Sequence, residues 1–227
     1  MTGVLINAGA VILGAALGAL FGRFLSENLR RAAMTALGLC TLYIGVKGSL
    51  GALNPLVLIG ALVGGAILGT LVDIDGAVAR LGEKAQAMAK GRGGTVGEGF
   101  VAASLLFCVG AMAVTGSLEA GLRGDNATLL AKSALDFFAA ITLASALGIG
   151  VALSAVSVLV YQGAIALLAG AVAPLLTPVA VAEMGAAGSL LIVALAFNLL
   201  GIAKIKVADL LPAIVIAPVL AMVAGAV

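Results

Sequence analysis

The chain has 227 residues, of which 63% are hydrophobic and only 10% are charged, and its formal net charge is +2. A soluble domain carries about 25% charged residues, so this composition leaves too little polar surface to cover a water-soluble globule. Histidine is absent, which excludes imidazole metal sites and Ser-His-Asp catalysis. We therefore expect the lipid bilayer as a partner, no nucleic-acid partner, no cofactor and no enzymatic activity.

Long stretches without any charged residue indicate how the chain is organised. They cover residues 1–22, 48–72, 99–118, 137–182 and 184–203. A helix needs roughly 20 apolar residues to cross the hydrocarbon core of a bilayer. None of these stretches alternates apolar and polar residues as a transmembrane barrel strand does. Because every backbone N–H and C=O must be satisfied inside the bilayer, we predict an all-α, polytopic transmembrane helix bundle.

In chain order, the hydropathy pattern predicts about eight spans within a single membrane domain over residues 1–227, with seven spans left open. We expect them near residues 3–22, 32–47, 55–72, 98–118, 129–150, 155–175, 184–203 and 210–227. The first basic residue, Arg23, follows the first apolar stretch, whereas a signal peptide opens with positive charge. We therefore expect the first helix to be retained.

The basic residues predict the orientation through the positive-inside rule. With the N-terminus outside, nine basic residues fall in cytoplasmic connections and three fall outside. The cytoplasmic set is Arg23, Arg30, Arg31, Arg80, Lys84, Lys90, Arg92, Lys204 and Lys206, and the outer set is Lys47, Arg123 and Lys132. The longest polar connection, residues 73–98, then joins spans 3 and 4 in the cytoplasm, and its first part up to about Lys90 has the spacing of a surface helix.

Small residues mark helix faces that can approach other helices closely. Gly14, Gly18 and Gly22 are spaced four residues apart in the first span. We expect them to pack within the bundle, and a homo-oligomer formed through such glycine-rich faces is the alternative. A faint similarity of spans 1–3 to spans 6–8 also predicts an inverted repeat, which is common among secondary transporters.

Ionisable residues at membrane depth are costly and often mark transport pathways. Asp136 lies about two helical turns inside the fifth predicted span, at about 1.5 Å rise per residue. Lys132 lies one turn outward on the same face, from where it can snorkel to the interface. The residue Asp136 is therefore the first candidate ion ligand, and an intrahelical pair with Lys132 that only settles the helix end is the alternative.

Other polar side chains can complete such a site. Glu119 lies between Gly116 and Gly121, two glycines that can unwind the helix and free carbonyl groups for a cation. Carboxylates, hydroxyls and carbonyls are the ligands of hard cations, and the identity of any metal stays open. The further candidates for substrate or ion binding are Ser133, Thr115, Ser117, Gln162 and Asn198. For the last two, hydrogen bonding between helices is the alternative role.

Several short motifs resemble a bacterial family of YdfK/YqgA-like membrane proteins. They include Gly116-Ser-Leu-Glu119, Lys132-Ser-Ala-Leu-Asp136, Leu143-Ala-Ser-Ala-Leu-Gly-Ile-Gly150 and the ending Lys204-Ile-Lys206-Val-Ala-Asp209. The resemblance covers nearly the whole chain, and Asp209 replaces an Asn that is frequent in the family. It implies a multi-pass protein of the bacterial inner membrane with a domain of unknown function. A distant likeness of residues 135–140 to small manganese exporters favours cations only weakly.

Two functions stay open at this point. The first is a small secondary transporter or ion-conducting protein of the inner membrane, in which buried carboxylates bind a cation or a proton. The second is a structural or interaction protein of the membrane that has no transport activity.

Overall fold

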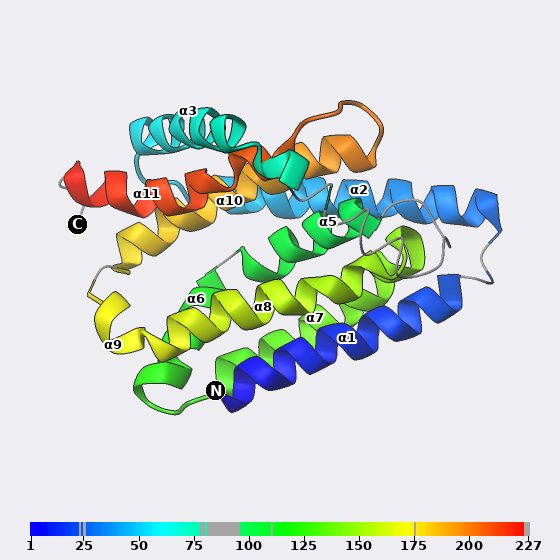
Figure 1. Ribbon diagram of the computed structural model, residues 1–227, viewed down its shortest axis with the longest axis horizontal. Coiled ribbons are helices and arrows are strands. Elements are labelled where there is room, and N and C mark those ends of the chain that lie inside the picture. Colours follow the sequence, from blue (N-terminus) through cyan, green and yellow to red (C-terminus); the bar gives the residue numbers. More distant parts are fainter. Residues whose placement is uncertain are drawn as a thin grey trace. The chain divides into compact units, whose positions relative to one another are not determined.

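The computed structural model in Figure 1 describes residues 1–22, 24, 26–77, 80, 96–109, 111–174 and 176–224, and every regular element in these ranges is helical. The chain divides into two compact units, which we describe one at a time. Unit 1 comprises Met1–Leu37, Val78–Cys108 and Met112–Gly170, and unit 2 comprises Gly38–Ala77, Val109–Ala111 and Ala171–Val227. The all-α class predicted from the sequence is confirmed, and the single membrane domain stays a prediction.

Unit 1 is built around the first helix of the chain. Its helices are α1 (Thr2–Gly22), α5 (Val96–Cys108), α6 (Ala111–Leu122), α7 (Ala127–Leu147) and α8 (Gly150–Leu167), and the short α9 (Ala169–Val172) follows. Helix α1 packs along α7 and α8, and α5 packs on α8, as Figure 1 shows. Residues separated by more than 100 positions in the sequence therefore lie side by side.

The glycine stripe of α1 explains this close packing. A Cβ atom added at Gly14 would lie 2.5 Å from the carbonyl oxygen of Phe137, and Gly18 and Gly22 face the carbonyl oxygens of Ile141 and Ser145 in the same way. Only glycine lets the backbones of α1 and α7 approach this closely. The prediction that this stripe packs within the bundle is confirmed.

Unit 2 holds the second half of α2 (Glu27–Ser49) together with the helices around α10. These are α3 (Pro55–Val72), α10 (Pro178–Leu199), the 3-10 helix η1 (Val207–Leu210) and α11 (Pro212–Val223). Helix α3 packs against η1 and α11, and α10 packs against α11. Both α3 and α10 begin with proline, and their N-cap side chains, Asn54 and Thr177, accept hydrogen bonds from backbone N–H groups of the first turn.

Five helices in the described ranges are long and apolar enough to cross a bilayer, namely α1, α3, α7, α8 and α10. Six result if α5 and α6 count as one span; this pair, which covers the span predicted near residues 98–118, is bent by 61°. Helix α2 is less apolar than these five, and α11 is shorter. Eight spans, the inverted repeat and the orientation of the N-terminus stay predictions.

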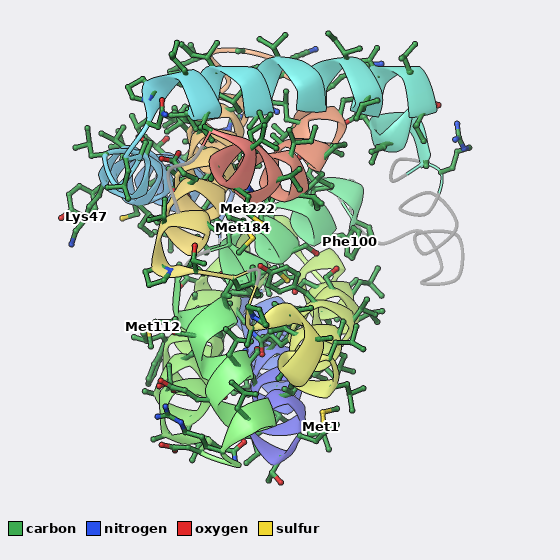
Figure 2. The ribbon with its side chains drawn as sticks, turned by 90° about the vertical axis from the view of Figure 1, so that its left-hand side faces the viewer. Met1, Lys47, Phe100, Met112, Met184 and Met222 are labelled. Atoms are coloured by element: carbon green, nitrogen blue, oxygen red, sulfur yellow. The ribbon has the colours of Figure 1, made fainter. Side chains whose placement is uncertain are left out.

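Large apolar side chains are exposed along the candidate spans. In α3, Leu56 and Leu71 are each 78% exposed, and Figure 2 shows side chains standing out all along this helix. In α1, Leu13 is 63% exposed. Such surfaces are stable only in contact with lipid or protein, so the chain is a multi-pass membrane protein whose spans imply a bilayer.

The long connection over residues 73–98 is described only at 73–77, 80 and 96–98. Residues 74–77 form one helical turn, and the N–H of Asp75 donates to Oδ1 of Asp209 at 2.8 Å. Apart from residue 80, the rest of the predicted surface helix lies outside the described residues. An asparagine would offer an amide oxygen where Asp209 offers a carboxylate oxygen, and both accept an N–H, so the contact does not require the residue that is frequent in the resembled family.

Candidate functional site

The candidate site lies in unit 1, on the buried face of α7. The start of α7 is tied to the start of α1, because the N–H of Gly3 donates to Oδ1 of Asn126 at 2.9 Å. After this start, residues at helical spacing form the buried face of α7. They include Leu129, Lys132, Ser133 and Asp136. Helical spacing thus places two charged side chains on the face of α7 that is buried in the bundle.

Lys132 and Asp136 form a buried ion pair one helical turn apart. Nζ of Lys132 lies 2.8 Å from Oδ1 and 2.7 Å from Oδ2 of Asp136. The two residues are only 6% and 5% exposed. The expectation that Lys132 snorkels to the interface is wrong, because its ammonium group finds a carboxylate inside the bundle, and this attraction offsets part of the cost of leaving water.

Two amide side chains extend the ion pair across three helices. Nδ2 of Asn7, in α1, donates to Oδ2 of Asp136 at 3.0 Å and to Oε1 of Gln162, in α8, at 3.2 Å. Asn7 and Gln162 are both fully buried. We call Asn7, Lys132, Asp136 and Gln162 the polar cluster.

The polar cluster leaves two hydrogen-bonding atoms without a partner. Within the described part of the chain, Oδ1 of Asn7 and Nε2 of Gln162 are buried and make no hydrogen bond. An unsatisfied buried polar group costs about 1–3 kcal/mol, and such groups in native proteins mark a bound water, an ion or a functional strain. The cluster therefore has an unused acceptor and an unused donor beside a neutralised carboxylate.

Glu119 lies apart from this cluster. Its Oε2 accepts a hydrogen bond of 2.6 Å from the hydroxyl of Thr128, which joins the end of α6 to the start of α7. The expectation that glycines unwind the helix here is wrong, since α6 runs through Gly116 and Gly121 to its end. Gly116 instead packs on the Thr128 side chain, and Gly121 packs on the backbone of α8 at Ala166, so both glycines serve close packing.

The three hydroxyl candidates lie on α6 and α7. Ser117 donates to the carbonyl of Ala113 at 2.6 Å, and Ser133 donates to that of Leu129 at 2.7 Å, so each bonds to its own helix one turn back. Thr115 is half-buried in α6. Ser133 shares the buried face of α7 with Lys132 and Asp136, which makes it the member of this group nearest in sequence to the ion pair.

Asn198 belongs to unit 2 and closes a loop. Its Nδ2 donates to the carbonyl oxygen of Ile205 at 2.7 Å, and its Oδ1 accepts from the N–H of the same residue at 2.8 Å. This paired contact fastens the connection after α10 to the end of that helix. Of the residues put forward from the sequence, the structure thus brings Gln162 to Asp136 through Asn7, while the contacts of Asn198 lie elsewhere.

Sequence reasoning overlooked one buried carboxyl, Glu183 in α10. It is 0% exposed, and its Oε1 accepts hydrogen bonds from the N–H groups of Leu53 at 2.8 Å and Asn54 at 2.6 Å. Its signal in the sequence is that it is the one charged residue between Asp136 and Lys204. It lies between two charge-free stretches, one residue before the span predicted over 184–203, so the charge pattern places it outside a span.

No group of three or more Cys, Asp and Glu side chains in the described residues is placed to hold a metal ion. The carboxyl groups of Asp136, Glu119 and Glu183 instead have separate partners. A cation at the polar cluster would therefore meet a single carboxylate and amide oxygens, a ligand set suited to a proton or a hard cation.

Comparison with known proteins gives consistent matches along the chain. A family profile described as "Protein of unknown function (DUF554)" matches residues 2–222. The "Uncharacterized protein YqgA" of Escherichia coli (strain K12) is 34% identical over 220 residues, which cover 95% of this chain and 94% of the relative. The "Uncharacterized membrane protein YdfK" of Bacillus subtilis (strain 168) is 30% identical over 227 residues, which cover 98% and 96%. No solved structure matches the chain significantly.

Proposed function

The chain belongs to the DUF554 family, and on this premise we propose that it is a small secondary transporter or ion-conducting protein whose polar cluster binds a cation or a proton. The observation that carries the proposal is the buried ion pair beside two unsatisfied amide atoms. Charged residues are rare within transmembrane segments because each costs several kcal/mol or more to place there. Where they persist inside a bundle, they commonly serve the movement of charge.

The contacts of Asp136 support this proposal, because they allow a cation or a proton to compete with Lys132 for the carboxylate. The carboxylate of Asp136 is held by the ammonium group of Lys132 at 2.7 Å and by the amide of Asn7 at 3.0 Å. A visiting cation or proton takes the place of the Lys132 ammonium on the same carboxylate. The free Oδ1 of Asn7 and the Oε1 of Gln162 are further oxygen ligands within the cluster.

Of the residues put forward from the sequence, this site retains Asp136 and Gln162 and adds Asn7 and Lys132. We further propose that the protein lies in the bacterial cytoplasmic membrane with its N-terminus outside, which the distribution of basic residues supports. The proposed site does not include Glu119, Thr115 or Ser117. Glu119 accepts a hydrogen bond from Thr128, and Ser117 donates one to the carbonyl of Ala113.

Flux through liposomes that contain the purified protein tests the proposal. We expect cation or proton flux in the wild type and its loss in Asp136→Asn, which removes the charge but keeps the shape of the side chain. The matched control is Asp125→Asn, because Asp125 is an exposed turn residue whose Oδ1 accepts from the N–H of Ala127. Equal flux in the wild type and Asp136→Asn would contradict the proposed role.

A structural role is the second candidate, and one observation favours it. The polar cluster connects α1, α7 and α8, so it can hold these helices in register without any ligand. In that case Asp136→Ala would disperse or unfold the protein, while wild-type liposomes would show no flux above empty ones. The two measurements together separate the candidates.

A further inference from the structure

The connection after α10, which is drawn in orange in Figure 1, has a backbone that is fixed by hydrogen bonds. Gly201 follows the helix in the left-handed conformation, at φ 70°, and the N–H of Ile202 donates to the carbonyl oxygen of Phe197 at 2.9 Å. This is the Schellman arrangement, which favours glycine at that position. A few residues later, the Asn198 side chain holds both the N–H and the carbonyl group of Ile205. The connection is therefore tied back to the helix from which it starts.

Two lysines flank the residue that Asn198 holds. Lys204 and Lys206, which we call the lysine pair, are exposed, whereas Ile205 between them is half-buried. The carbonyl oxygen of Ile205 also accepts the N–H of Val207 at 2.9 Å, so the backbone on both sides of Lys206 is fixed. In the described part of the chain, neither lysine forms an ion pair. Two positive charges are thus presented two residues apart on an ordered backbone.

The lysine pair lies at the end of two candidate spans. It follows α10 in the sequence, and the end of α3 packs on η1, where Gly69 faces the carbonyl oxygen of Asp209. Large apolar side chains are exposed at this end, namely Leu71 and Val72 on α3 and Ile202 beside the pair. Exposed apolar side chains of a span contact acyl chains, and lysines near the end of a span reach the headgroups. The pair therefore lies at the boundary between the two.

We propose that the lysine pair binds the headgroup phosphate of an anionic phospholipid, and that Asn198 positions the pair. Basic residues beside a transmembrane helix attract anionic lipids at the bilayer surface. Asp209, the acid nearest to the pair in the sequence, is buried and bonds to the N–H of Asp75. It therefore does not cover the two ammonium groups.

A lipid fits this surface better than a free phosphate ion. The exposed side chain of Ile202 offers an apolar contact to an acyl chain beside the two charges. A free phosphate ion would gain nothing from that contact. The proposal does not depend on ion binding at the polar cluster, because the two sites share no residue and belong to different units.

The lipid selectivity of the purified full chain tests the proposal. The protein is incubated in detergent with equal amounts of phosphatidylglycerol, which is anionic, and phosphatidylcholine, which is zwitterionic. Native mass spectrometry then gives the ratio of the two lipids that stay bound. We expect the wild type to prefer phosphatidylglycerol, and the ratio to fall about fivefold for each lysine replaced in Lys204→Gln and Lys206→Gln. Equal ratios in the wild type and the double variant would overturn the proposal.

The matched control is Lys47→Gln. Lys47 is an exposed lysine near the end of α2, just before the start of α3 in the sequence, and Figure 2 shows its side chain pointing away from the helices. This variant should keep the wild-type ratio, and so should the double variant Lys204→Arg with Lys206→Arg, which keeps both charges. A fall in Lys47→Gln as large as that in the double glutamine variant would contradict a specific site.

Two further measurements separate position and ligand from charge alone. Asn198→Ala keeps both lysines but releases Ile205, so the ratio should fall although the net charge is unchanged. A wild-type ratio in this variant would remove the positioning role. Inorganic phosphate, compared with chloride at the same ionic strength, should leave the ratio unchanged. If phosphate alone abolishes the preference, a free anion is the ligand and the lipid proposal fails.

Discussion

Asp136 and Glu183 are both buried acids in a bundle with few charges, yet the chain accommodates them in opposite ways. Asp136 receives a full positive charge from Lys132, four residues earlier on the same helix. In the part of the chain that the structure describes, Glu183 receives backbone N–H groups from a turn about 130 residues away in the sequence. A buried acid can thus be held either by a counter-ion or by backbone N–H donors.

The unused atoms differ in the same way. Around Asp136 they are an amide oxygen and an amide nitrogen on α1 and α8, and at Glu183 the unused atom is an oxygen of the carboxyl itself. The first arrangement is open to an added ligand between helices, and the second leaves one oxygen of a single carboxyl without a partner in the described residues. The following variants test this distinction. For each variant, the free energy of unfolding is compared with that of the wild type in the same detergent.

Removing the counter-ion should have the largest effect. We expect Lys132→Met to destabilise the protein by about 3–5 kcal/mol, because it leaves the carboxylate of Asp136 buried and uncompensated. The matched variant is Lys132→Met with Asp136→Leu, which removes both charges and should recover most of this loss. If the single and double variants are equally unstable, the charge on Asp136 is not what Lys132 stabilises.

Disturbing the contact that brings Asn7 to Asp136 should have the next largest effect. Gly18→Ala places a methyl group against the carbonyl of Ile141 and should cost about 1–3 kcal/mol through overpacking. Gly9→Ala is the control on the same helix, because a Cβ there meets no atom within 4 Å. Thermal unfolding should separate the two, and equal stability of both variants would contradict the packing of α1 on α7.

The turn that donates to Glu183 should be sensitive to its helix cap. Asn54 accepts the N–H of Leu56 at 3.0 Å as the N-cap of α3. Asn54→Ala should therefore cost about 1 kcal/mol, and Asn54→Ser should retain most of the stability. Chemical unfolding of the two variants measures the difference. A serine variant as unstable as the alanine variant would argue against the cap.

Replacing the carboxyl of Glu183 by an amide should have the smallest effect. Glu183→Gln keeps the acceptor for both N–H groups, so we expect a change below about 1 kcal/mol, within the range of one neutral hydrogen bond. A loss as large as that of Lys132→Met would contradict this expectation. The unfolding midpoint of the variant beside the wild type decides between these outcomes.

Local patterns were sufficient for some of the elements and for part of the site. The apolar stretch over residues 55–72 matches α3 at both ends, because Pro55 starts the helix and Asp73 ends it in a left-handed conformation at φ 56°. The pairing of Lys132 with Asp136 follows from helical spacing alone. The direction of the Lys132 side chain could not be predicted from the sequence. The same sequence is compatible with snorkelling and with burial, and only the packing of neighbouring helices decides between them.

The contacts of Glu119 and Glu183 show where local reasoning failed. The glycines beside Glu119 are compatible with an unwound helix and with close packing. They pack closely, because Gly116 lies against Thr128 and Gly121 lies against Ala166. Nothing near Glu183 in the sequence indicates that the turn at Leu53 and Asn54 will meet it. Donors so distant along the chain become visible only when the helices are assembled.

By itself, the sequence determined that this protein is helical and spans a membrane. The length of an apolar stretch and its lack of charge are properties of that stretch alone, and they decide whether it can cross the bilayer as a helix. The tertiary structure decided which polar groups meet. Asn7, Asp136 and Gln162 come together only because glycines let α1 approach α7 closely. In a bundle with so few polar side chains, the partner of each one depends on how the helix backbones pack, which no single segment encodes.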